Sequence, residues 1–168
     1  MLSAMGLRRK LSMSGVRVCF DVGSVRVGVA KCDRDQILAV PVLTLTNDES
    51  LVSAATRVIL DIEPGAIYVG LPINLKGQVT ASTQAALNFA EALSLDLRKV
   101  SFVGEIRLID ERLSTASALS SLRDSGRTTK DSRGIVDQVA AVEILEFAMS
   151  LEKHTGELAG AQLANHNQ

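Results

Sequence analysis

Hydrophobic and polar positions alternate through residues 16–30, and this alternation predicts two short strands joined by a tight turn. Asp21 stands where the first of these strands ends. Gly23 and Gly28 would let a backbone or a substrate approach where a side chain would collide. The sequence therefore predicts a hairpin with a carboxylate at the end of its first strand, beside a place where a phosphate could sit.

The next segments predict a strand, a helix and a second strand. Residues 37–45 form a third strand, and Pro41 places it at a sheet edge because proline lacks the N–H that a central strand needs. Apolar residues keep helical spacing over Leu51–Ile62, until a Pro-Gly pair ends the helix. Ala66–Leu71 is almost continuously apolar, which is typical of a strand covered on both faces of an α/β sheet.

The second half of the chain predicts further helices around one short strand. Residues 127–134 are polar and basic without apolar spacing, which indicates a loop. Ser114 or Thr115 could cap a helix before this loop. The expected elements are a helix at 80–95, a strand at 106–109, a helix from Ser114 or Thr115 to about 126, a mobile loop at 127–134 and a final helix at 135–151.

This order of elements predicts one α/β domain. Three antiparallel strands followed by right-handed crossovers give a mixed five-stranded sheet, in the order 3-2-1-4-5, with helices on both faces. We expect this domain to span residues 16–151. Residues 1–15 are expected to be a flexible N-terminal extension, and residues 152–168 a flexible C-terminal tail.

Composition limits the classes of function. A chain of 168 residues with 46% hydrophobic content fits one domain with a sizeable core. Its 18 basic and 19 acidic residues give a net charge of -1, so a nucleic-acid site would be a local basic patch. Aromatic residues make up only 3%, which argues against a base-stacking platform. Two cysteines favour a reducing compartment, and no apolar run reaches the roughly 18 residues of a membrane span.

Three acidic residues are candidates for a catalytic site. Asp21 ends the first strand, Glu111 follows the fifth strand, and Asp137 lies in the first turn of the final helix. The predicted topology brings all three to one edge, where clustered carboxylates repel unless Mg²⁺ or Mn²⁺ neutralises them. Such ions support phosphodiester hydrolysis. Structural roles remain as alternatives: Asp21 could form an Asx-turn, Glu111 could pair with Arg112, and Asp137 could stabilise its helix dipole.

Polar residues around the same edge could bind a nucleic acid. Basic side chains near the proposed edge could neutralise phosphates that flank the cleaved one, and the loop after the fourth strand adds a polar amide. Asp110 is expected to point away from Glu111 and is a reserve ligand. The candidate nucleic-acid-binding residues are Arg26, Asn74, Lys76, Arg112, Arg127, Lys130 and Arg133.

Four motifs together resemble the YqgF/RuvX family, a bacterial branch of the ribonuclease H-like nucleases. They are DVGSVRVGVA at 21–30, VGLPINLKG at 69–77, DERLST at 110–115 and DQVAA at 137–141, and the likeness covers 16–151. The resemblance implies a ribonuclease H-like hydrolase with a divalent-metal site, and a cytoplasmic location. It also implies a nucleic-acid substrate, either the 5′ end of pre-16S rRNA or a Holliday junction. Residues Asp21, Glu111 and Asp137 would then be both the catalytic residues and the metal ligands.

The sequence departs from RuvC-type resolvases after the fourth strand and in the final helix, where Ala141 and Ile144 stand in place of a second acid, and it leaves other functions open. Those enzymes commonly carry an acid after the fourth strand, whereas residues 71–74 read LPIN, so Glu111 must substitute. Cleaving a four-way junction needs two sites and therefore a homodimer. A ribosome-assembly factor that binds RNA without cutting is one alternative. Phosphoryl transfer is another, because Asp21, Gly23 and Ser24 also resemble the first phosphate loop of actin-like ATPases.

Overall fold

A computed structural model describes residues 15–114 and 133–164, except for the side chain of Arg133. In these residues one mixed sheet has the strand order β3-β2-β1-β4-β5-β6. The first three strands pair antiparallel, β1, β4 and β5 run parallel, and β6 is antiparallel to β5. The strands are β1 (Arg17–Val22), β2 (Arg26–Cys32), β3 (Ala39–Thr46), β4 (Ala66–Leu71), β5 (Glu105–Asp110) and β6 (Ala161–Gln162).

The predicted order of the first five strands is confirmed. Strand β3 lies at the edge, as Pro41 predicted, and the β2–β3 register shifts between Val29 and Ala30, opposite the proline. The predicted strand total was wrong, because β6 adds a sixth strand beside β5. The proposed helix that would end near residue 126 lies outside the described residues, as do residues 127–132 of the proposed loop at 127–134. The predicted end of that loop was wrong, because the last helix already begins at Arg133.

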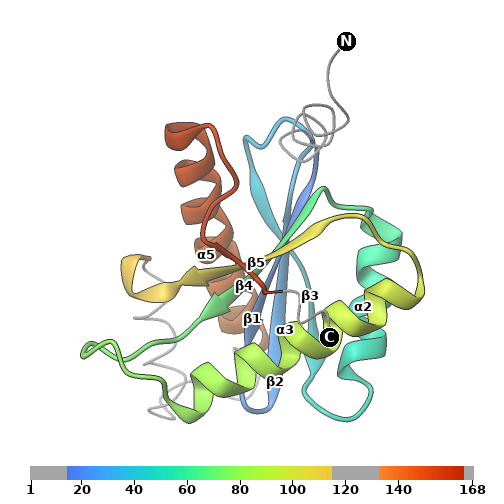
Figure 1. The fold of residues 1–168 in the computed structure, drawn as a ribbon, viewed down its shortest axis with the longest axis vertical. Coiled ribbons are helices and arrows are strands. Elements are labelled where there is room, and N and C mark those ends of the chain that lie inside the picture. Colours follow the sequence, from blue (N-terminus) through green and yellow to red (C-terminus); the bar gives the residue numbers. More distant parts are fainter. Residues whose placement is uncertain (1–14, 115–132, 165–168) are drawn as a thin grey trace.

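Helices cover both faces of the sheet (Figure 1). Helices α2 (Leu51–Ile62) and α3 (Ala81–Lys99) pack on one face, and α5 (Arg133–Thr155) crosses the other. Side chains of β1 alternate between these layers: Phe20 belongs to the α2–α3 core, whereas Cys19 belongs to the core beneath α5. Because strand side chains have a period of two, Asp21 also lies on the α5 face.

The prediction of a flexible tail from residue 152 was wrong for the described part of that segment. Helix α5 continues to Thr155, and β6 then pairs with β5. The segment has no apolar periodicity, but Ala159 and Leu163 are buried in the two cores, and hydrogen bonds that sequence spacing does not reveal hold it in place. The guanidinium of Arg107 donates to the backbone carbonyls of Leu158, Ala159 and Gly160.

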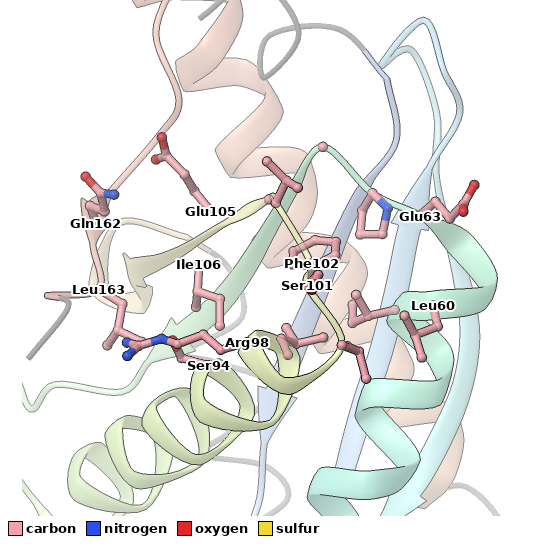
Figure 2. A pocket seen from close by; sticks show the side chains of 17 residues that line it. Leu60, Glu63, Ser94, Arg98, Ser101, Phe102, Glu105, Ile106, Gln162 and Leu163 are labelled. Carbon is pink, nitrogen blue, oxygen red and sulfur yellow. The ribbon is translucent and has the colours of Figure 1, made fainter. Parts of the chain in front are cut away.

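A hollow of about 810 Å³ lies at the end of the sheet where β4 and β5 begin. Figure 2 shows its lining side chains, which come from the last turns of α2 and α3, the start of β5, and β6. The three predicted acids stand at the opposite end, where β1 and β5 finish. The hollow is therefore separate from the candidate site.

Candidate active site

Asp21 lies in a row of three residues that crosses neighbouring strands. It pairs directly with Gly28 of β2. On its other side, Phe20 pairs with Val69 in the parallel β1–β4 ladder, so the next residues along, Asp21 and Gly70, are also neighbours. The row therefore runs Gly28, Asp21, Gly70, with a glycine on each side of the carboxylate.

Both glycines leave room for the other two acids. A Cβ atom on Gly28 would collide with the backbone carbonyl oxygen of Asp137, near the start of α5. A Cβ atom on Gly70 would collide with Oε1 of Glu111, the first residue of the short 3-10 helix η1 (Glu111–Leu113). Asp137 and Glu111 thus approach the sheet on either side of Asp21. The structure brings all three acids to one edge.

The three acids are buried, with exposed fractions of 2% for Asp21, 3% for Glu111 and 0% for Asp137. Each makes polar or electrostatic contacts, as a charge out of water requires. The pKa of the Cys19 thiol is raised, first by burial and then by the negative charges of Asp21 and Glu111. Both carboxylates therefore lie close enough to Cys19 of β1 to affect its thiol.

Arg26 is directly paired with one of these acids. Its Nε atom donates to Oδ2 of Asp137 over 2.9 Å. The Asp137 side chain is only 1% exposed, whereas that of Arg26 is 29% exposed. The sequence had assigned Arg26 only to substrate phosphates. In the structure Arg26 pairs with Asp137, and the rest of its side chain is partly exposed to solvent.

Arg112 has an acidic partner too, and it is not Glu111. Its Nη2 atom donates to Oδ2 of Asp110 over 2.6 Å. The Asp110 side chain also accepts from the backbone N–H of Arg112 and caps η1. Hydrogen bonding to Arg112 lowers the pKa of Asp110. Asp110 is thus engaged as a cap and a charge partner, and the alternative of a Glu111–Arg112 pair was wrong.

The loop after β4 contains two predicted contact residues with different surroundings. Asn74 Oδ1 accepts from the backbone N–H groups of Lys76 and Gln78, at 3.1 and 2.8 Å, so this side chain holds the turn. Lys76 has an exposed side chain. Arg127 and Lys130 lie outside the described residues, and Arg133 begins α5 without a described side chain.

Contacts that sequence reasoning missed fasten the start of α5 to the edge strand. The Thr44 hydroxyl donates to the carbonyl of Gly134 over 3.0 Å, and Gln138 Nε2 donates to the same hydroxyl over 3.0 Å. These bonds fix the turn of α5 that carries Asp137. Thr44 lies in an ordinary strand pattern, so only the register of β3 against α5 reveals its role. Gly70, inside an apolar strand, was the available signal for a close approach.

The carboxylates have the right chemistry for a divalent cation, since Mg²⁺ and Mn²⁺ prefer oxygen donors. However, the described residues include no group of three or more His, Cys, Asp or Glu side chains that could hold a metal ion as they stand. The ion pair to Arg26 gives one physical reason, because it engages an oxygen of Asp137. A metal at this edge therefore stays a prediction.

The chain resembles proteins of known name along most of its length. A relative from Leifsonia xyli subsp. xyli, named "Putative pre-16S rRNA nuclease", is 43% identical over 149 residues, covering 88% of this chain and 93% of the relative. A protein of the same name from Streptomyces avermitilis is 39% identical over 160 residues, covering 93% and 96%. None of the described helices is both long and apolar enough to span a membrane.

Solved structures support the fold. Thermus thermophilus RuvC, in complex with a Holliday junction substrate, aligns with a TM-score of 0.54 at 10% identity, covering 86% of this chain and 99% of RuvC. This likeness confirms the ribonuclease H-like fold. The family model RuvX, described as "Holliday junction resolvase", matches residues 15–151. The chain therefore belongs to the RuvX family.

Proposed function

We propose that this protein is a nuclease that hydrolyses phosphodiester bonds of structured nucleic acid at the edge formed by Asp21, Glu111 and Asp137. The observation that carries the proposal is the meeting of three buried carboxylates around a row with a glycine on each side of Asp21. Buried acids of this kind cost free energy, and a catalytic site explains their presence better than packing does. Family membership supports a hydrolase that acts on nucleic acid.

The proposed site would use a divalent cation, Mg²⁺ or Mn²⁺, held by Asp21, Glu111 and Asp137. When bound, such an ion activates water and stabilises the leaving oxygen. Arg26 compensates the charge of Asp137, and 29% of its side chain is exposed at the edge where a phosphate would approach. Lys76 and Arg112 are the other described cations that we assign to substrate phosphates.

The 5′ end of pre-16S rRNA is our first candidate substrate, because the relatives carry that name. A four-way DNA junction is the second, and this substrate would require a homodimer. Roles in binding for Asn74, Arg127, Lys130 and Arg133 stay predictions, as does a cytoplasmic location.

One observation favours a different function. The described acids do not form a group that could hold a metal ion as they stand. A ribosome-assembly factor that binds RNA without cutting it would have no need of such a group. This alternative predicts that nucleic-acid binding survives the loss of Asp21 and that the wild-type protein does not cleave.

The test compares wild type with Asp21→Asn on two labelled substrates, a pre-16S rRNA 5′ leader and a four-way DNA junction. Each is incubated with Mg²⁺, Mn²⁺ or EDTA. We expect metal-dependent cleavage that falls at least about a hundredfold in Asp21→Asn, because even outer partners of a metal site cost 10–100-fold. Asp61→Asn, an exposed acid on α2, is the matched control and should cleave normally. Binding of both substrates without cleavage by wild type would instead support the assembly factor.

A further inference from the structure

The segment between β4 and α3 projects from the body of the molecule at the edge that carries the acids (Figure 1). An isolated antiparallel bridge joins Ile73 to Val79, so residues 73–79 form a small hairpin, called here the Leu75 hairpin. Leu75 is 96% exposed, more than any other large hydrophobic residue in the described part of the chain. Isolated apolar residues are common on protein surfaces, so exposure alone does not indicate a contact.

The first additional observation is that this hairpin is braced. Asn74 Oδ1 accepts hydrogen bonds from two backbone N–H groups, those of Lys76 and Gln78. The N–H of Gly77 donates to the Asn74 carbonyl over 2.8 Å, and Gly77 adopts the left-handed φ of 75° that closes the turn. A braced tip holds Leu75 away from the core and loses little entropy when it meets a partner.

The second observation concerns the base of the hairpin. The Thr83 hydroxyl donates to the carbonyl of Pro72, and Thr80 caps α3 by accepting from the backbone N–H of Thr83. The hairpin is therefore tied to the first turn of α3. Its direction relative to the sheet edge is fixed by hydrogen bonds at both its base and its tip.

The third observation is its position beside cations and the acidic edge. A Cβ atom on Gly77 would lie 3.3 Å from Nη1 of Arg112, so the hairpin reaches the side chain of a residue in η1, which begins with Glu111. Lys76 is exposed next to Leu75, and Leu113 of η1 is also 70% exposed. An apolar tip with two cations nearby matches the chemistry of a nucleic acid, in which apolar base faces lie between phosphates.

We propose that Leu75 inserts between two stacked bases next to the phosphodiester bond that reaches the acidic edge. Leucine is one of the side chains that act as wedges between base steps, and unstacking one step costs a few kcal/mol. Lys76 and Arg112 contact neighbouring phosphates and offset this cost. The inference rests on the proposed function and extends it: the substrate is paired nucleic acid that must be opened locally. The cations favour a nucleic acid over a protein partner.

The test measures base unstacking separately from cleavage. The Asp21→Asn protein, in which we expect cleavage to be slow, is mixed in Mg²⁺ with the four-way DNA junction or the leader RNA. In each probe, 2-aminopurine replaces successive adenines, and its fluorescence rises when the base is unstacked. We expect a rise at one position with Leu75, no rise with Leu75→Ala, and a restored rise with Leu75→Phe. Fluorescence anisotropy should show that Kd changes less than about tenfold, because the phosphate contacts remain.

The matched control is Leu38→Ala, a leucine with 58% exposure in the connection between β2 and β3, at the opposite end of the sheet. It should leave the fluorescence rise unchanged. A rise that persists in Leu75→Ala, or bound substrate with no rise at any position, would overturn the wedge and point to a protein partner for Leu75. Failure of both nucleic acids to bind at all would overturn the proposed function itself.

Discussion

Two arginine–acid pairs join α5 to the hairpin strands, one near each end of the helix, and they differ in exposure. At the far end, Arg17 of β1 and Glu152 have side chains only 0% and 1% exposed. At the acidic edge, Asp137 is equally buried, but 29% of the Arg26 side chain reaches solvent. We call the wholly buried Arg17–Glu152 pair the closed pair and the partly exposed Arg26–Asp137 pair the open pair. The exposure of Arg26 distinguishes the pair that we assign to the candidate site from the pair that is wholly buried.

The closed pair is held by additional bonds. Arg17 makes two parallel hydrogen bonds to Glu152, both of 3.0 Å. The Tyr68 hydroxyl donates to Glu152 and accepts from the backbone N–H of Ala159 over 3.1 Å. This network connects β1, β4, α5 and the C-terminal segment. Every polar group in it has a protein partner, which is the condition under which a buried charge pair is tolerated.

Breaking the closed pair should have the largest effect on stability. Arg17→Met leaves Glu152 as a buried charge without its guanidinium, and we expect a loss of about 3–5 kcal/mol in the free energy of unfolding. Urea denaturation would measure it. The double variant Arg17→Met/Glu152→Met should recover much of the loss, because it removes both charges. A single variant as stable as wild type would contradict the structural role of this pair.

Breaking the open pair should affect activity more than stability. Arg26→Gln removes a charged hydrogen bond, and we expect a stability loss of about 1–3 kcal/mol. The cleavage rate should fall at least about tenfold, equivalent to about 1.4 kcal/mol of barrier, because Asp137 loses its partner and the substrate loses a cation. Arg26→Lys keeps the positive charge but lacks the planar guanidinium, so its cleavage rate should lie between those of wild type and Arg26→Gln. Unchanged cleavage in Arg26→Gln would remove Arg26 from the site.

Alkaline pH should lower the free energy of unfolding through Tyr68, which bonds to the closed pair, by less than the loss of Arg17 does. Burial, and then the hydrogen bond to Glu152, raise the pKa of Tyr68 above its ordinary 10.0. The folded state therefore holds the tyrosine proton more tightly, so this contribution to stability is complete below pH 10 and is lost as the pH rises through the raised pKa. Stability should fall by up to about 1.4 kcal/mol per pH unit above 10. Urea midpoints of wild type and Tyr68→Phe should show a flatter profile in the variant.

Sequence patterns predicted the strands of the sheet better than they predicted the arginine–acid pairs between the sheet and α5. Period-two alternation identified the first strands, and the rule of right-handed crossovers predicted the order of the first five, while strand ends located Asp21 and Glu111. The partner of Arg26 depends on the register of α5 over β2, which no local pattern encodes. Arg17 lies on the strand face that α5 covers, and its partner lies 135 positions away, a separation that no local pattern encodes.

The ordered C-terminal segment changes where the folding unit ends. The family match stops at residue 151, one position before Glu152. A chain trimmed to that limit would keep all three acids of the candidate site but lose the counter-ion of Arg17, the acceptor for the Tyr68 hydroxyl, and the strand β6 that covers the side of β5. The region that the family model matches therefore leaves out residues that join β1, β4 and β5 to one another in this structure.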